Sequence, residues 1–158
     1  MGLGVRPVPR RIVVVGASLA GVRAAEALRR EGFDGRLTVI GAERHFPPYD
    51  RPPLSKAVLT GAATSDGTGA ATAAVRLGLS PDWDADLLLG TSARGLDLAS
   101  RRVTLDGGAQ VPFDGLVIAT GVVPRRPPAL AHGRNVFFLR TVEDALALRA
   151  ALRGPERE

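Results

Sequence analysis

The sequence contains no cysteine, and lysine occurs only at Lys56. Without cysteine the chain can form no disulfide, thiolate metal site or iron–sulfur ligation, so any redox chemistry must come from a bound cofactor. Aromatic residues make up only 4% of the chain, and the arginines are scattered, which argues against a nucleic-acid partner. No apolar run reaches the roughly 20 residues that cross a membrane, and residues 1–10 lack the apolar segment of a secretory signal. We therefore expect a cytoplasmic protein with no membrane partner.

What is present indicates a folded domain. The chain has 158 residues, of which 45% are hydrophobic, and this is enough to bury a core. Its net charge of +5 comes almost entirely from arginine. We interpret this bias as the codon usage of a GC-rich genome, and an acidic protein partner is the alternative.

The first forty residues predict a βαβ unit. Residues 11–15 are a β-branched run typical of a buried parallel strand, and residues 36–40 form a second such run. Between them, the small residues 16–21 predict a tight turn, and residues 19–31 predict a helix that ends at Gly32. The predicted apolar face of this helix consists of Leu19, Val22, Ala25 and Leu28. The predicted fold class is α/β, with a Rossmann-like parallel sheet.

The rest of the chain predicts shorter elements. We expect a short helix at 55–59 and a strand within 83–89. Three antiparallel strands are predicted at 93–97, 102–105 and 111–113. A buried strand at 115–119 and a short strand at 137–139 follow. The three antiparallel strands would form a small β-meander inserted in the α/β fold, with Asp106-Gly-Gly108 as a hairpin turn.

A closing helix begins after Thr141, which serves as its cap, with Glu143 and Asp144 in its first turn. Its expected apolar side consists of Val142, Ala145, Leu146, Leu148 and Leu152. We divide the chain into a flexible lead at 1–10, one domain at 11–153 and a tail at 154–158. Residues 60–74 are small and polar and predict a flexible connection.

The most informative motif is Gly16-Ala-Ser-Leu-Ala-Gly21. A dinucleotide site needs a tight turn between strand and helix, close approach of the backbone to the pyrophosphate, and a helix N-terminus aimed at that charge. Gly16 supplies the turn and Gly21 lets the helix lie close to the sheet, while Ser18 stands where a second glycine is usual. The alternative is that these residues only shape a tight βα turn.

An acid follows the second predicted strand, as such sites require. Glu43 lies 20-odd residues after the turn, where a carboxylate can accept hydrogen bonds from both ribose hydroxyls. The alternative is that Glu43 is a solvated loop acid.

Four ordered blocks carry a resemblance to a known family. They are Val14-Val-Gly-Ala-Ser-Leu-Ala-Gly21, Pro48-Tyr-Asp-Arg-Pro-Pro-Leu-Ser-Lys56, Asp114-Gly-Leu-Val-Ile-Ala-Thr-Gly121 and Leu139-Arg-Thr-Val-Glu-Asp144. Together they resemble the FAD-dependent ferredoxin reductases, which serve dioxygenase and cytochrome P450 systems and are related to rubredoxin reductases.

The resemblance implies a noncovalent FAD. Its expected contacts are Gly16, Ser18, Leu19, Ala20 and Gly21 at the pyrophosphate, Ala42 and Glu43 at the ribose, Ala93 at the adenine, Ala119, Thr120 and Gly121 beside the cofactor, Arg51, Pro52 and Lys56 on the flavin side, and Arg140 at the flavin or pyrophosphate. A sole lysine among many arginines favours a specific role for the Lys56 ammonium, with a chance surface position as the alternative. Tyr49 either packs near the flavin or anchors its loop.

The reaction implied is hydride transfer from NAD(P)H to FAD, followed by single-electron transfer to a ferredoxin-like iron–sulfur protein. Such chemistry needs no acid–base triad, so we assign no catalytic residue and no metal ligand. His45 and His132 have no carboxylate nearby in sequence and receive no role.

Two features of the family are not found. No second Gly-x-Gly-x-x-Gly and no later Gly-Asp block follow residue 121. We therefore expect the chain to correspond to the N-terminal, FAD-binding part of the family. A dinucleotide-binding module without turnover, or a degenerate remnant, is the alternative. The electron acceptor, the choice between NADH and NADPH, and the oligomeric state stay open.

Overall fold

The computed structural model describes residues 8–45, 48–60, 71–73, 75–130, 133 and 135–154. Most of the predicted lead, most of the 60–74 connection, most of the tail and His132 lie outside these residues. The chain divides into two compact units, a first unit of residues 1–44 and 79–121 and a second unit of residues 45–78 and 122–158. No helix within the described ranges is long and apolar enough to cross a membrane.

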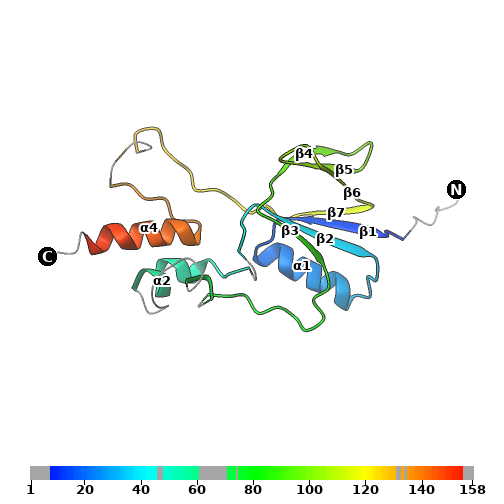
Figure 1. Cartoon of the computed structure of the whole chain (residues 1–158), viewed down its shortest axis with the longest axis horizontal. Coiled ribbons are helices and arrows are strands. Elements are labelled where there is room, and N and C mark those ends of the chain that lie inside the picture. The colour runs from blue at the N-terminus through cyan, green and yellow to red at the C-terminus, as the bar shows by residue number, and fades with distance from the viewer. Residues whose placement is uncertain are drawn as a thin grey trace, which may run out of the picture. The chain divides into compact units, whose positions relative to one another are not determined.

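A parallel four-stranded sheet forms the centre of the first unit (Figure 1). Its strands, in spatial order, are β3 (Asp86–Leu89), β2 (Arg36–Gly41), β1 (Arg11–Val15) and β7 (Gly115–Ile118). All neighbouring strands run parallel, with Val15 opposite both Ile40 and Ile118. The strands predicted from β-branched runs are therefore confirmed, and their carboxyl ends lie at one edge of the sheet.

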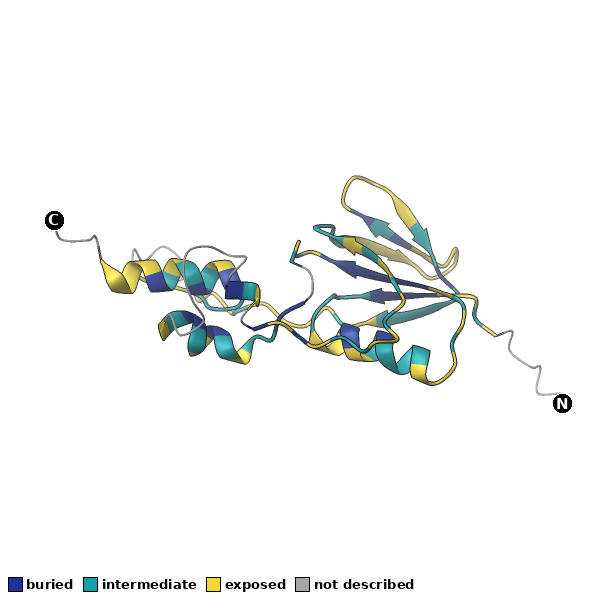
Figure 2. Cartoon of the chain, turned by 60° about the horizontal axis from the view of Figure 1, so that its bottom comes forward, coloured by how far each residue is buried: buried dark blue, intermediate teal, exposed yellow. Residues whose placement is uncertain are grey.

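Helix α1 (Leu19–Arg30) covers one face of this sheet. Val22 and Ala25 are buried, and Ala25 packs in a core with Val14 and Leu37 of the two central strands. Figure 2 shows the buried centre of β1 and β2 in dark blue. Placing Leu19 on the buried face was wrong, because this first helical residue is 46% exposed.

A three-stranded antiparallel sheet supplies the core on the opposite face. It consists of β4 (Ala93–Asp97), β5 (Arg102–Leu105) and β6 (Gln110–Pro112), in that spatial order. Val13 of β1 packs here with Val103 and Phe113, because successive residues of a strand point to opposite faces. The predicted β-meander is confirmed, and Gly107 and Gly108 take the positive φ values that its turn requires.

Arg29 fixes the segment that leads into β3. Its Nε donates to the carbonyl oxygen of Asp84 at 2.8 Å, and its Nη1 donates to the carbonyls of Phe33 at 2.6 Å and Gly35 at 2.9 Å. Nη2 also lies 3.2 Å from the Asp84 carboxylate. One planar side chain therefore joins the end of α1, the turn before β2 and the approach to β3.

The second unit is built from helices. It contains the 3₁₀ helix η1 (Pro52–Ser55), α2 (Ala57–Thr60) and α4 (Val142–Arg153). The core of this unit consists of Tyr49, Leu54, Val58, Ala71, Val75, Val142 and Ala145.

The short helix expected at about 55–59 is present as α2, with different bounds, and the 3₁₀ helix η1 precedes it. Two other predictions for the second unit are wrong. Residues 137–139 form no strand in the described structure. Leu152, expected on the apolar side of α4, is 71% exposed, and Arg149 is buried instead, with Nη1 donating to the Val58 carbonyl at 3.4 Å.

The start of α4 is capped as predicted. The Thr141 hydroxyl accepts the backbone N–H of Asp144 at 3.2 Å. The Asp144 carboxylate in turn accepts the backbone N–H of Thr141 at 2.8 Å and that of Arg140 at 2.9 Å. This reciprocal pairing satisfies amide groups that the helix itself leaves without partners.

Replacing Thr141 by alanine is expected to lower the free energy of unfolding by about 1 kcal/mol, because one helix N–H loses its acceptor. Urea unfolding followed by circular dichroism measures the change. Thr141→Ser keeps the hydroxyl and is the matched control, so equal losses in both variants would contradict the capping role.

Asp114 joins the starts of β7 and β1. Its carboxylate accepts hydrogen bonds from the backbone N–H groups of Arg10 and Arg11 and from the Arg11 guanidinium, at 3.0, 2.9 and 2.9 Å. The guanidinium hydrogen bond is the largest of the effects that lower the pKa of Asp114 from 3.8 to about 2. The ionised carboxylate is therefore favoured by folding.

This shift predicts an acid-sensitive contribution to stability. A carboxyl whose pKa is lower in the folded chain stabilises the fold above its unfolded pKa, and the contribution is lost as pH falls through the folded pKa. The urea midpoint of Asp114→Asn should lie below that of the unmodified chain at neutral pH. The difference should shrink as pH falls from about 4 towards about 2. A difference that stays constant over this range would show that the Asp114 charge is not its source.

Candidate functional site

The turn after β1 is held by close backbone contacts on two sides. The Gly16 N–H donates to the Ile40 carbonyl at 2.8 Å, and the Ala119 N–H donates to the Val15 carbonyl at 2.8 Å. Gly16 has a φ of +119°, and a Cβ built on it would lie 2.1 Å from the Ala119 carbonyl oxygen. Only glycine fits this position, for reasons of both conformation and space.

Gly21 brings the first turn of α1 onto the same place. A Cβ built there would lie 1.7 Å from the carbonyl oxygen of Gly16. The predicted roles of the two glycines, a tight turn and close helix packing, are both required by this geometry. The start of α1 therefore lies at the carboxyl edge of the sheet.

The N-terminus of α1 has neither a side-chain cap nor an acid in its first turn among the described residues. Ser18 caps the helix in an extended conformation, but among the described residues its side chain makes no capping hydrogen bond, and the first turn contains no acid. The first amide N–H groups of a helix point out of its end and carry partial positive charge. Such an end suits an anion such as a phosphate.

The end of β2 supplies a second side of the candidate site. Ala42 is exposed and Glu43 is half-buried. The carbonyl of Glu43 accepts the Gly90 N–H at 3.1 Å, and that of Gly41 accepts the Thr91 N–H at 3.0 Å. These bonds fix Glu43, the acid predicted to bind the ribose, beside residues 90–91, which lead into Ala93 at the start of β4.

An exposed apolar rim accompanies the turn, and part of it was missed from sequence. Ile118 is 65% exposed at the end of β7, and the exposed Leu19 opens α1. Thr120 and Gly121, which follow β7, are also exposed, and Gly121 has a φ of +68°. The sequence could have indicated an exposed Ile118, because this residue is the last of the apolar run that forms β7.

The remaining predicted contacts, Arg51, Pro52, Lys56 and Arg140, lie in the second unit. The structure brings Arg51 and Arg140 together, since Nη1 of Arg51 donates to the Arg140 carbonyl at 2.7 Å. Pro52 is the first residue of η1, and Lys56 follows its last residue as the C-cap, with an exposed side chain. The Arg140 backbone N–H is taken up by Asp144, so this residue connects Arg51 to the cap of α4.

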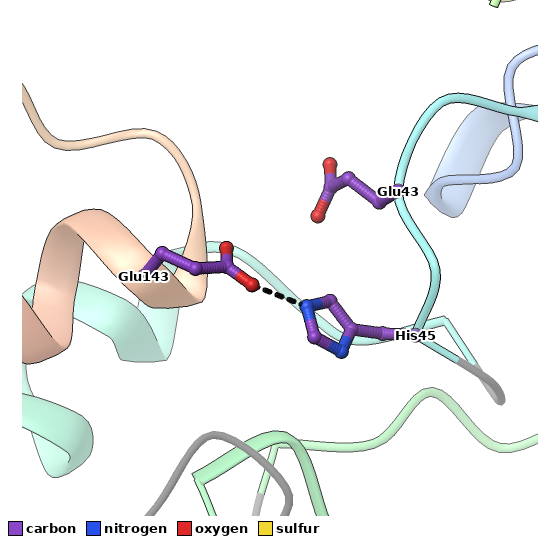
Figure 3. Close-up of side chains that lie close together, drawn as sticks. All are labelled: Glu43, His45 and Glu143. Carbon is purple, nitrogen blue, oxygen red and sulfur yellow. Dashed lines mark hydrogen bonds and ion pairs between the residues drawn. The ribbon is translucent and has the colours of Figure 1, made fainter. Parts of the chain in front are cut away.

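His45 has a carboxylate partner, which the sequence analysis did not find. Figure 3 shows its hydrogen bond to Glu143, with Nε2 of His45 2.5 Å from Oε1 of Glu143. Partial burial raises the pKa of Glu143, but hydrogen bonds from its own N–H, His45 and Thr141 bring this pKa below its ordinary value. The partners are 98 residues apart, so no local pattern could indicate the pair.

Comparison with known proteins identifies relatives of this arrangement. Residues 10–157 match the family described as pyridine nucleotide-disulphide oxidoreductase. The chain is 42% identical, over 144 residues, to the ferredoxin–NAD(+) reductase component of the p-cumate 2,3-dioxygenase system of Pseudomonas putida. This match covers 90% of the chain and 34% of the relative.

Two solved structures share the fold. The reductase in the covalent putidaredoxin reductase–putidaredoxin complex superposes with a TM-score of 0.74 at 36% identity, covering 89% of this chain and 33% of that one. The ferredoxin reductase for the CYP199A2 system of Rhodopseudomonas palustris gives a TM-score of 0.75 at 29% identity, covering 89% and 33%. The chain spans about a third of the length of the curated relatives that it matches. Because the family match covers nearly the whole sequence and agrees with the glycine turn and sheet order, the chain belongs to the pyridine nucleotide-disulphide oxidoreductase family.

Proposed function

We propose that this chain is the FAD-binding part of an NAD(P)H-dependent flavoprotein reductase, with residues 11–153 as the binding domain. The observation that carries the proposal is the turn at Gly16, where the backbone fills the space that any side chain would need. A tight glycine turn of this kind places the N-terminus of the following helix where its main-chain N–H groups can approach a pyrophosphate. The family match supports the same assignment.

The residues present fit the parts of FAD in their chemistry. The open N-terminus of α1, with Ser18 and Ala20, would hold the pyrophosphate by amide hydrogen bonds and helix charge. The half-buried Glu43 carries a carboxylate that would accept the ribose hydroxyls. In the second unit, Arg51 and Lys56 would supply positive charge on the flavin side.

We propose further that the electrons pass to a ferredoxin-like iron–sulfur protein. The p-cumate relative is named as a ferredoxin–NAD(+) reductase component, and another relative is putidaredoxin reductase. When bound, FAD would supply the conversion of a two-electron hydride into single electrons. This chain would contribute binding and orientation, while the choice between NADH and NADPH stays open. The cytoplasmic location also stays a prediction, and fractionation of producing cells tests it.

Titration with FAD tests the proposal directly. The unmodified chain should bind FAD saturably, seen as a change in flavin absorbance and fluorescence. Gly16→Val should bind none, because its side chain would collide with the Ala119 carbonyl and displace the turn that places the start of α1. Gly78→Val is the matched control, since no atom of the described residues lies within 4 Å of a Cβ built at Gly78. If the unmodified chain does not bind FAD, the proposal is contradicted and the alternative, a degenerate remnant, is favoured.

A second variant separates binding from folding. Ser18→Asp should raise or preserve the free energy of unfolding, because aspartate is a good cap and its charge favours a helix N-terminus. The same charge should weaken FAD and ADP binding by about tenfold or more, since it repels the pyrophosphate. Ser18→Asn, of equal size and without the charge, is the control and should bind more tightly than Ser18→Asp. Equal affinity in the two variants would place the pyrophosphate elsewhere.

A further inference from the structure

Tyr49 is a buried link between the predicted flavin-side loop and the start of α4. It is 4% exposed, and its hydroxyl accepts the backbone N–H of Val142, the first residue of α4, at 3.1 Å. The two residues are 93 positions apart. The hydroxyl thus satisfies a helix N–H, and the ring fixes the loop against the core of the second unit. Of the two roles considered for Tyr49, anchoring of the loop is the one that these contacts support.

The guanidinium of Arg51 lies over this ring. Its central carbon is 5.4 Å from the ring centroid of Tyr49, within the range of a cation–π interaction. Nη1 lies 3.5 Å from the Tyr49 hydroxyl and donates to the Arg140 carbonyl at 2.7 Å. Arg51 is therefore held on one side by a rigid ring and at its tip by the backbone before α4.

His45 supports the ring from another direction. The two ring centroids are 5.8 Å apart at an interplanar angle of 66°, an edge-to-face arrangement. The hydrogen bond from His45 to Glu143 joins this ring to α4 as well. Tyr49 thus has little freedom to reorient. The Arg51 guanidinium, which lies over the Tyr49 ring, is therefore also restricted in its orientation.

We propose that Tyr49 is a positioning residue, which acts on the flavin side of the cofactor by holding Arg51 in its binding orientation. This inference rests on the proposed function. A free arginine side chain must give up rotamer freedom when it contacts a ligand, and a side chain that is already fixed loses less. The Arg140 carbonyl then serves the site indirectly, because it fixes the tip of Arg51.

A double-mutant cycle with two ligands tests the proposal. Tyr49→Leu removes ring and hydroxyl and should weaken FAD binding about tenfold, whereas Tyr49→Phe keeps the ring and should lose less. ADP binding should stay unchanged in both variants, because ADP lacks the flavin half. In the Arg51→Ala background, Tyr49→Leu should weaken FAD binding no further, since the effect passes through Arg51.

Thr141→Ala is the control for a purely structural effect. It removes a cap at the same helix end without touching Arg51, so it should lower the unfolding midpoint while leaving FAD affinity unchanged. Three outcomes would overturn this inference but not the proposed function. They are additive effects of Tyr49→Leu and Arg51→Ala on FAD binding, a parallel loss of ADP binding, and an unchanged FAD affinity in Tyr49→Leu. An unmodified chain that binds neither FAD nor ADP would instead overturn the proposed function, and this inference with it.

Discussion

The contact between Gly16 and the end of β7 is the constraint on which the first unit depends. A Cβ on Gly16 would lie 2.1 Å from the Ala119 carbonyl, so any side chain there would push apart two strands that are hydrogen-bonded neighbours. The same turn determines where α1 begins, because Gly21 in turn packs on the Gly16 carbonyl. The close packing of the sheet, the turn and the start of α1 therefore requires that residues 16 and 21 have no side chain.

The two long helices of the described structure, α1 and α4, differ in how their N-termini are capped. The start of α4 is closed by its own side chains, since Thr141 and Asp144 form a reciprocal cap and Glu143 adds an acid to the first turn. The start of α1 has no acid in its first turn and no capping bond from Ser18 among the described residues. Capping stabilises a helix, so leaving α1 open costs stability that a bound anion can restore. This contrast supports α4 as structural and α1 as a binding end.

Much of the first unit could be predicted from sequence, because its signals are local. The β-branched run 11–15, the glycine turn and the Asp106-Gly-Gly108 hairpin each fix their structure within a few residues, and the parallel sheet follows from their order. The family resemblance was confirmed as well, since it rests on short sequence blocks that can be identified without knowing the fold. The ligand contacts themselves stay predictions.

What could not be predicted depends on contacts between distant residues. The pairing of His45 with Glu143 and of Tyr49 with Val142 spans more than 90 positions and leaves no local pattern. On α4, Leu152 is exposed and Arg149 is buried instead, and the hydrogen bond of Arg149 to the Val58 carbonyl joins residues 91 positions apart. Residues 137–139 are apolar like a strand but have no ladder partner in the described structure.

Backbone amide chemical shifts give the most direct test of the claim that the turn after β1 is a pyrophosphate site. In a ¹⁵N-labelled chain titrated with ADP, the account predicts the largest shifts at residues 16–21, with smaller changes after β2 and none at the turn between β5 and β6. Saturable binding that leaves the amides of residues 16–21 unmoved, or titration with no binding at all, would contradict it.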